Sequence, residues 1–416
     1  MKKETWEVEL DANMKSIRAS FNSIQEIHSD GDKLYIFQED RVGVAHNSRY
    51  VSTDLESNQT VSSGLTAPPI SDIRYYEYRG GISLNPESFA FIGNRKYFFD
   101  LRRGNMCRLS QNGIEPISLK GVDKYTKDKA DKMLSGVEKD IAIGVIDRRN
   151  GEYVLNFKWS ETLDITPVYI GDTVFDYTLD MGSGVYMSQF YVGGTLSIYD
   201  LTTGDYYLNE IISIAGSVVT SRFPSLLDGE TVFRSNVYKS DNISYSDTLG
   251  VWNSFYDYIP DFLESAGMNL VTWKGGQLYL HDSKTANQGE FYGEDLDSQL
   301  TVVSNQHPET IKLFKNVKLL TNDVYGDSDW STTPNGVNTS TEQVSELISD
   351  DFAYKENSMT AGFLRDSTTP NETYPLLDGE RLRGRWLSIE CNLDGGLANQ
   401  KEILGAEFNN AVSFKS

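Results

Sequence analysis

The 416-residue chain has few cysteines, few histidines and little proline. Its two cysteines, Cys107 and Cys391, lie far apart, so the sequence contains neither a disulfide framework nor a cysteine metal motif. We expect both to be buried as small apolar side chains. The histidines stand singly, without the spacing of metal ligands, and are expected to be structural or solvated. They are His28, His46, His281 and His307.

Motifs for common catalytic chemistry are also missing. The sequence has no P-loop, no G-x-S-x-G, no H-E-x-x-H and no G-x-G-x-x-G after an expected strand. It has no apolar run long enough to span a membrane, and its first residues do not resemble a signal peptide. We therefore expect a soluble, non-enzymatic protein made in a cytosol, with no catalytic residue, no metal, no cofactor and no membrane anchor.

Positive charge is scarce relative to negative charge. The chain has 60 Asp and Glu against 38 Lys and Arg, a formal net charge of −22. Such a surface repels a phosphate backbone, so we do not expect it to grip nucleic acid. It would still let DNA slide past without sticking, although acidity of this kind most often serves solubility.

Aromatic residues and glycine are abundant. The 24 Tyr and 19 Phe favour strands, and 34 Gly against 11 Pro indicate turns based on Gly, Asn and Asp. Asn112-Gly113 and Asn150-Gly151 are strong two-residue hairpin signals. In the first part of the chain we expect strands at Lys33–Gln38, Val42–Ala45, Ser88–Ile92, Lys96–Leu101, Met106–Ser110, Ile114–Leu119, Ile141–Asp147 and Glu152–Trp159.

Three other segments of the first part have their own character. Residues 1–20 are expected to form an arm or one strand, and residues 52–72 a long exposed loop. Tyr125–Ser135 is the one convincing helix, and Gly136 would end it.

Residues 160–240 break the pattern. They contain ten Asp or Glu and three Lys or Arg, and they predict a small β-barrel or sandwich inserted between two strands of one propeller blade. The expected strands of this insertion are Val168–Leu179, Val185–Val192, Thr195–Leu201, Tyr206–Ile214 and Val218–Arg222.

Residues 301–416 predict a further β region. The expected long strands are Ile311–Leu320, Ala353–Phe363 and Leu382–Cys391, with Ser328–Ser340 as a disordered or exposed loop.

A weak internal repeat links distant parts of the chain. Gly31, Gly93 and Gly275 each begin a polar turn followed by a Tyr-centred strand, and the first two lie 62 residues apart (93 − 31). A decorated four-stranded propeller blade has about this length. Within Ile243–Gly293, a short strand, a turn, a Trp-anchored segment and a second strand follow the same order. The repeat favours a β-propeller, although any all-β protein repeats such turns.

Several groups have both a functional and a structural interpretation. Asp327-Ser328-Asp329 could contact a cation, but a solvated turn is favoured because no calcium loop follows. Two of the 60 acids could form a glycosidase pair, which sequence alone does not reveal. Two aromatic clusters could stack on sugars, but are more often the inner faces of strands. They are Tyr75-Tyr76-Glu77-Tyr78 and Trp252, Phe255, Tyr256 and Tyr258.

In their order along the chain, these segments resemble the tail nozzle or muzzle proteins (phage stabilisation proteins) of short-tailed, crAss-like bacteriophages. The propeller-like segments are Tyr78–Ser88, Tyr97–Asp100, Arg103–Ser110, Gly144–Asp147, Glu152–Leu155, Ile243–Ser246, Trp252–Phe255 and Ile259–Pro260. The segments that resemble the family's closing region are Phe291–Gly293, Pro308–Phe314, Lys355–Asn357 and Arg383–Trp386. The resemblance covers roughly residues 20–159 and 240–415, and the insertion lies outside it.

The resemblance implies an all-β fold: a β-propeller, complete or partial, with an inserted small β-barrel and a C-terminal β region. The expected domains are propeller blades over 1–159, the insertion over 160–240, a continued blade over 241–300 and a closing β region over 301–416. Family members are longer, with further blades upstream. We therefore expect a smaller propeller, a split gene, or a ring completed by a partner chain.

The family's role implies a structural virion protein assembled in the host cytoplasm. It would form a homo-oligomeric ring, expected to be a hexamer, at the end of the tail, and would meet adaptor or ring proteins, fibres and a plug. Genome DNA would pass through without specific binding, along a lumen lined mainly by Asp, Glu, Ser and Thr.

Two alternatives belong to other functional classes. The first is a receptor- or glycan-binding tail-tip module acting through residues 160–240, which predicts exposed aromatic rings beside carboxylates. The second is a polysaccharide-degrading propeller enzyme, which predicts two carboxylates within about ten ångströms in a cleft.

Overall fold

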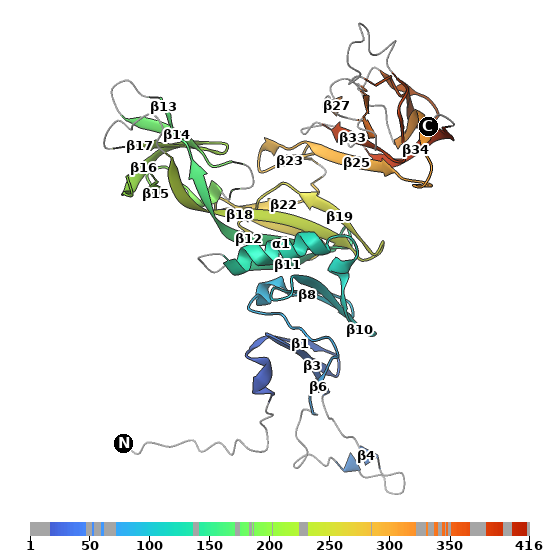
Figure 1. Cartoon of the computed structure of the whole chain (residues 1–416). Helices are drawn as coiled ribbons and strands as arrows, with labels where there is room; N and C mark the ends of the chain where they lie inside the picture. The colour runs from blue at the N-terminus through green and yellow to red at the C-terminus, as the bar shows by residue number, and fades with distance from the viewer. Residues whose placement is uncertain are drawn as a thin grey trace. The chain divides into compact units, whose positions relative to one another are not determined.

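The computed structural model describes residues 17–46, 52–53, 60–61, 72–135, 141–170, 175–182, 185, 187–201, 203–223, 232–283, 285–321, 330–331, 337–339, 343–345, 347, 351–366, 380–393 and 402–413. The chain divides into two compact units, residues 1–281 and 282–416 (Figure 1). The described residues form many strands and a single α-helix, which confirms the all-β prediction.

The first unit begins with two four-stranded antiparallel sheets. The first has the order β1-β2-β3-β6, and its strands are β1 (Ile24–Asp30), β2 (Lys33–Gln38), β3 (Val42–His46) and β6 (Arg74–Tyr75). The second is a meander of β7 (Ala90–Ile92), β8 (Arg95–Asp100), β9 (Asn105–Ser110) and β10 (Gly113–Pro116). A separate two-stranded pair joins β4 (Ser52–Thr53) and β5 (Thr60–Val61). Short 3-10 turns lie at Ala19–Phe21, Pro86–Ser88 and Ile117–Leu119.

Two further sheets follow in the first unit. The third contains β11 (Ile141–Asp147), β12 (Glu152–Ile165), β18 (Phe233–Ser246) and β19 (Val251–Tyr256), and α1 (Asp123–Ser135) packs against it. The fourth is a meander of β20 (Phe262–Ala266), β21 (Asn269–Lys274) and β22 (Gln277–Leu280).

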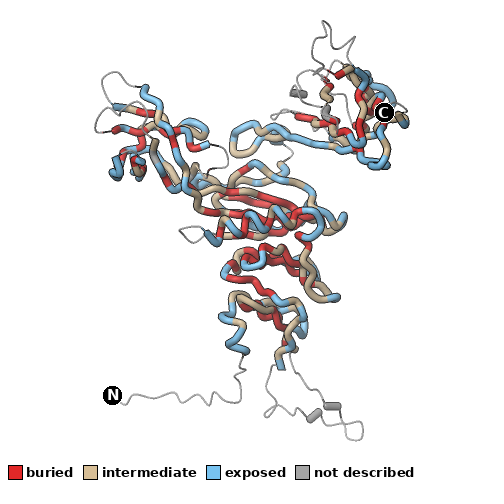
Figure 2. The backbone as a smooth tube through the Cα atoms, viewed as in Figure 1, coloured by how far each residue is buried: buried red, intermediate tan, exposed pale blue. Residues whose placement is uncertain are grey.

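Successive sheets of this unit stack face to face, with a separate hydrophobic core in each gap (Figure 2). Strand β8 shows why. Phe98 faces the first sheet and packs edge-to-face on Phe37, with ring centroids 5.4 Å apart. Tyr97 faces the third sheet, where its ring stacks on Tyr153 at 4.9 Å. Because side chains alternate along a strand, the run Tyr97-Phe98-Phe99 supplies apolar groups to both faces.

The gap between the third and fourth sheets is built in the same way. Strand β12 directs Tyr153 toward the second sheet, and its neighbour Val154 joins a cluster with Leu263 and Leu270 of the fourth sheet. The helix α1 covers part of the gap between the second and third sheets, where Ala130 and Met133 are buried.

The insertion grows out of the third sheet. Strands β12 and β18 pair in register over their whole length, from Glu152↔Ser246 to Ile165↔Phe233, and carry the insertion at their far end. Its other strands are β13 (Val168–Tyr169), β14 (Asp176–Asp180), β15 (Thr195–Asp200), β16 (Tyr206–Ala215) and β17 (Val218–Arg222), in the order β18-β15-β16-β17-β14-β13. This curved sheet encloses a hydrophobic core of its own.

The second unit contains two five-stranded sheets that share one core. One is formed by β25 (Ser298–Ser304), β33 (Leu387–Leu393), β28 (Val337–Thr339), β29 (Val344–Ser345) and β27 (Trp330–Ser331). The other is formed by β30 (Ala353–Tyr354), β31 (Ser358–Gly362), β26 (Lys312–Thr321), β32 (Arg383–Gly384) and β34 (Ile403–Val412). A short hairpin joins β23 (Glu290–Phe291) and β24 (Glu294–Asp295).

Most expected strands and the helix are confirmed, and Lys33–Gln38, Ile141–Asp147 and Val218–Arg222 have the expected bounds. Several predictions need correction. The expected single strand Val168–Leu179 is instead two antiparallel strands, β13 and β14. The expected strand Val185–Val192 is instead a single bridge at Val185 and a 3-10 turn at Met187–Gln189. The segment Ile114–Leu119 ends in a 3-10 turn, because Pro116 has no N–H to continue the ladder.

Three further corrections concern the second unit. Ala353–Phe363 is a tight hairpin, because Glu356 and Asn357 take positive φ angles of 52° and 55° and reverse the chain. Leu382–Cys391 belongs to two different sheets, through β32 and β33. The expected loop Ser328–Ser340 contributes β27 and β28 where it is described.

The specific propeller and barrel predictions remain predictions, because the described residues close neither a propeller nor a barrel. Gly31 and Gly93 do occupy the same place, each in the turn that leads into the second strand of its sheet. Gly275 instead leads into a third strand. No helix among the described residues is long and apolar enough to cross a membrane.

Replacing Phe98 by Ala should destabilise the first unit by about 3–5 kcal/mol, because it opens a cavity between two sheets. Urea unfolding of the whole chain, read together with hydrogen exchange of β8 and β9, measures this. Phe262→Ala is the matched control, because Phe262 lies on the fourth sheet, outside this gap, and is 41% exposed. An equal loss in the two variants would contradict a continuous core between the first two sheets.

Candidate functional site

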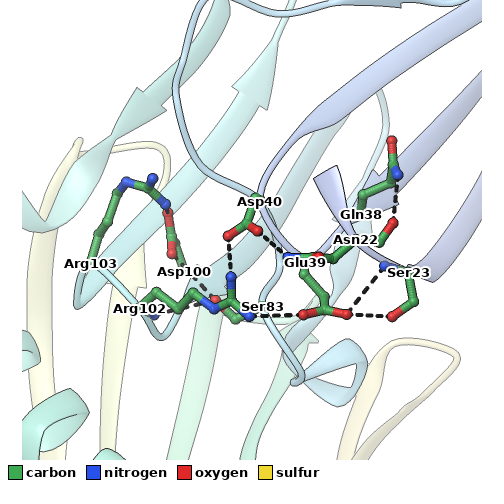
Figure 3. A network of polar contacts seen from close by, with 9 residues as sticks. All are labelled: Asn22, Ser23, Gln38, Glu39, Asp40, Ser83, Asp100, Arg102 and Arg103. Atoms are coloured by element: carbon green, nitrogen blue, oxygen red, sulfur yellow. Dashed lines mark hydrogen bonds and ion pairs between the residues drawn. The ribbon is translucent and has the colours of Figure 1, made fainter. Parts of the chain in front are cut away.

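The most developed polar site of the chain clamps the first sheet to the second (Figure 3). Arg102, just after β8, forms ion pairs with Glu39 at 2.9 Å and with Asp40 at 2.5 Å. Glu39 also accepts a hydrogen bond from the backbone N–H of Ser23 at 3.2 Å, and Asp40 accepts one from the Asn22 amide. One guanidinium therefore ties the β2–β3 turn and the preceding chain segment to the next sheet.

A buried carboxylate supports the same clamp. Asp100 is fully buried and accepts hydrogen bonds from Tyr78 at 3.0 Å, from Ser83 at 3.3 Å and from Arg103 at 3.2 Å. Burial raises the pKa of Asp100, and the nearby Arg103 opposes that rise. The site therefore holds the carboxyl group by direct hydrogen bonds from three side chains, which belong to two chain segments.

Two glycines let the chain pass between these groups. A Cβ atom at Gly81 would overlap the Gln38 carbonyl oxygen and the Arg41 nitrogen, and one at Gly80 would overlap the Asp100 carboxylate. The segment can then donate from the Ile82 N–H to Gln38 at 3.1 Å. Gly80-Gly81, part of the family-like segment Tyr78–Ser88, is therefore required by close backbone approach.

Lys96 forms a second link between these two sheets. Its side chain is fully buried, its ammonium pairs with Asp30, and it lies 4.4 Å from the centre of the Tyr35 ring. The hydrogen bond from Lys96 lowers the pKa of Asp30. The ion pair and the cation–π contact compensate for removing this charge from water.

Two lysines, one on the third sheet and one on the fourth, hold the loop that connects these sheets. Lys158 of β12 donates to the carbonyl of Asp261, and Lys274 of β21 donates to the carbonyl of Ile259 at 2.8 Å. The Asp261 carboxylate accepts from the Gly275 N–H at 2.8 Å. Burial lowers the pKa of Lys158 to about 8, although Asp261 opposes that shift. These contacts fix the loop that enters the fourth sheet.

The cysteines lie in separate cores, as predicted. Cys107 is fully buried between the first two sheets, and Cys391 is 2% exposed in the core of the second unit. Burial raises the pKa of the Cys391 thiol to about 12 and that of Cys107 further. Neither thiol forms a disulfide in the structure.

The histidines have unrelated neighbours. His28 lies against Phe91, with ring centroids 4.3 Å apart, and His281 is 2.9 Å from the Thr272 hydroxyl. His46 lies 3.6 Å from Asp32, and His307 lies 3.5 Å from Glu309. Among the described residues no group of three His, Cys, Asp or Glu could hold a metal ion. Asp327-Ser328-Asp329 lies outside the described residues.

Most residues of the two aromatic clusters serve the fold. Tyr76 and Tyr78 pack on the core between the first two sheets, and Tyr258 is 3% exposed. The Trp252 indole donates to the Ile117 carbonyl at 3.1 Å. Phe255 differs, because it is 59% exposed. The structural interpretation is therefore confirmed for the buried members.

A cleft of about 230 Å³ lies where α1 meets the base of the insertion. Glu161 is the one carboxylate in its described lining, and it accepts from the Trp159 indole at 3.3 Å and pairs with Lys239 at 3.3 Å. The paired carboxylates that a polysaccharide-degrading enzyme needs are not present in the described wall of this cleft.

The outer face of the fourth sheet is unexpectedly apolar. Phe262, Trp273 and Leu278 are cross-strand neighbours on it, with Leu280 beside them. Phe262 is 41% exposed, Leu278 62% and Leu280 53%. Sequence analysis missed this face, although the alternation Leu278-Tyr279-Leu280 was its signal.

Comparison with known families places one part of the chain. Residues 286–366 match the family model described as the Crassvirus muzzle protein C-terminal domain. This supports a crAss-like phage muzzle protein, a structural tail protein of the virion, and so confirms the family resemblance. No curated protein matches the chain.

The match lies within the second unit and includes three of the four closing segments, all except Arg383–Trp386. It stops before β33 and β34, which pair with β25 and β26 inside it. The folded domain therefore extends beyond the matched stretch.

Arg102→Ala should release the clamp, because Glu39 then lacks its fork-shaped partner, and amide exchange in residues 18–23 and 38–41 should quicken by roughly tenfold, equivalent to about 1.4 kcal/mol. Arg102→Lys should recover part of the protection, since an ammonium cannot bridge both carboxylates as a fork. Hydrogen exchange with mass spectrometry measures both. Unchanged exchange in the Ala variant would refute the clamp.

Stability should rise between about pH 8 and pH 10 because of Lys158. The pKa of Lys158 is lowered to about 8 in the folded state, so in this window the unfolded chain binds more protons than the folded chain. Raising the pH removes those protons, and the free energy of unfolding therefore increases. Lys158→Met should flatten that part of the curve. Urea unfolding of both proteins at several pH values measures the difference, and parallel curves would exclude Lys158 as its source.

Proposed function

We propose that this chain is a non-enzymatic structural subunit of the distal tail nozzle, or muzzle, of a short-tailed phage. The main support for this proposal is the match of residues 286–366 to the muzzle C-terminal domain. The subunit would reside in the virion tail and assemble in the host cytoplasm. It would extend the DNA exit channel and seat fibres or a plug.

The arrangement of the first unit is consistent with a stiff wall element. Its four sheets are coupled by hydrophobic cores and by charged clamps, so that bending one gap would break apolar packing and ion pairs together. Stacked antiparallel sheets of this kind are what propeller blades are made of. We therefore keep the proposal of a partial propeller over 1–159 and 241–300, interrupted by the insertion and followed by the β region 301–416.

Ring formation is supported by the exposed apolar face of the fourth sheet. An apolar face on the last sheet of a stack is suited to cover by another sheet, and we propose that a neighbouring subunit of a homo-oligomeric ring provides it. A head-to-tail contact that closes would give the expected hexamer. The net charge of −22 suits a lumen past which DNA slides without specific binding.

The proposal is tested by the mass of the purified protein in solution together with its position in intact particles. A ring of this chain at the tail end is expected. A monomer that is absent from particles would overturn the proposal.

Leu278→Lys should weaken assembly, because it buries a charge in the subunit contact, and the apparent association constant should fall by at least about tenfold. Met268→Lys is the matched control, since Met268 is 61% exposed in the turn of the same sheet, away from its apolar face. Light scattering over a concentration series measures both. Equal mass distributions for Leu278→Lys and the unmodified chain would show that this face makes no subunit contact.

A further inference from the structure

The strand register places four residues in a row across the outer face of the insertion, on strands β12, β18, β15 and β16. Figure 1 labels these four strands. Their register makes them successive cross-strand neighbours: Asp164↔Arg234, Arg234↔Tyr199 and Tyr199↔Tyr206. Directly paired residues of antiparallel strands point to the same side, so all four share one face. Three strand spacings make this row about 14 Å long.

The aromatic end of the row is presented to solvent. Tyr206 is 77% exposed, and its ring is held by Tyr199, with centroids 4.7 Å apart. Leu208, two residues further along β16 on the same face, is 74% exposed. The structure thus offers a ring whose orientation is fixed on one side by another ring while its remaining surface stays open.

The charged end of the row is held by paired hydrogen bonds. Arg234 binds Asp164 in a bidentate manner, with N···O distances of 2.7 and 2.9 Å. A second bidentate pair, Arg222 with Asp176 at 2.7 and 3.0 Å, continues on the same face through Glu210. Each pair fixes its carboxylate while leaving oxygen lone pairs and further guanidinium N–H groups for other partners.

An open ring beside fixed donors and acceptors suits a polyhydroxylated ligand. The axial C–H face of a pyranose can lie on the Tyr206 ring, while its hydroxyl groups can donate to Asp164 and accept from Arg234. The core of a protein interface is depleted of charged residues, whereas half of this row is charged.

The net charge of the insertion also restricts the class of glycan that can bind. Residues 160–240 contain ten acidic and three basic residues, and both guanidinium groups of this face are already paired with carboxylates. This net negative charge would repel a sulfated, sialylated or uronic-acid glycan, or a nucleic acid. It would not repel a neutral glycan.

We propose that the row Asp164, Arg234, Tyr199 and Tyr206 is a binding site for a neutral glycan chain. This goes beyond the structural role, and does not depend on it: the insertion would let a wall subunit also recognise a surface polysaccharide.

The test uses the full chain, labelled and applied to an array of immobilised glycans. Maltohexaose, cellohexaose and a yeast mannan are the neutral probes, and polygalacturonic acid, a sialylated lactose and chondroitin sulfate are the acidic ones. Binding to a neutral probe in preference to all acidic probes is expected. Titration calorimetry with the best soluble probe then gives the dissociation constant.

Three variants locate the site. Tyr206→Ala should weaken binding by roughly tenfold, and Tyr206→Phe, which keeps the ring, should change it by less than about twofold. Tyr191→Ala is the matched control, because Tyr191 is 68% exposed in the same insertion but outside the row, and it should bind like the unmodified chain. An unchanged urea midpoint verifies that each variant folds.

Four results would overturn the proposal. They are no binding to any neutral probe at millimolar glycan, preference for an acidic probe, equal binding by Tyr206→Ala, and a Tyr206→Ala variant that alters only the protein's mass in solution, which would make the face a contact between copies. None of these concerns the location of the chain in particles, so failure here is distinct from failure of the structural role.

Discussion

The first unit depends on one constraint: its inner sheets must be covered on both faces. Strands β8 and β12 each send large apolar side chains in both directions, to a different neighbouring sheet on each side. A sheet of this kind has no face that water can cover without cost. The stack of four sheets is therefore the consequence of these strands, and its last sheet leaves apolar side chains such as Leu278 exposed.

Polar contacts fix how neighbouring sheets are placed on one another, which apolar packing alone does not specify. Arg102 joins two turns of neighbouring sheets, Lys96 is buried between them with an aromatic ring and a carboxylate, and Lys158 fastens the loop before the fourth sheet. Such contacts are costly unless every partner is in place. They therefore favour one arrangement of the sheets, as the proposed wall element of a large assembly would require.

The insertion keeps the proposed glycan site apart from the stack of sheets. Because β12 and β18 continue from the third sheet into the insertion without a break, the insertion is carried by the same two strands that form the stack's interior. Changes on its outer face, such as at Tyr206, leave the core of the stack untouched. The matched C-terminal domain, a two-sheet structure completed by β33 and β34, is a third independent element.

The sequence by itself determined the all-β class, most strand positions, the helix and the burial of both cysteines, because these follow from local periodicity, turn residues and side-chain polarity. It also carried the resemblance to crAss-like muzzle proteins, which the match of residues 286–366 supports. The sequence failed where pairing with distant strands decides the structure. Ala353–Phe363 folds as a hairpin because its second strand pairs with β26. Leu382–Cys391 divides between two sheets. Only the tertiary structure brought Arg102 to Glu39 and aligned Asp164, Arg234, Tyr199 and Tyr206, since residues of four separate strands share a row only through long-range register.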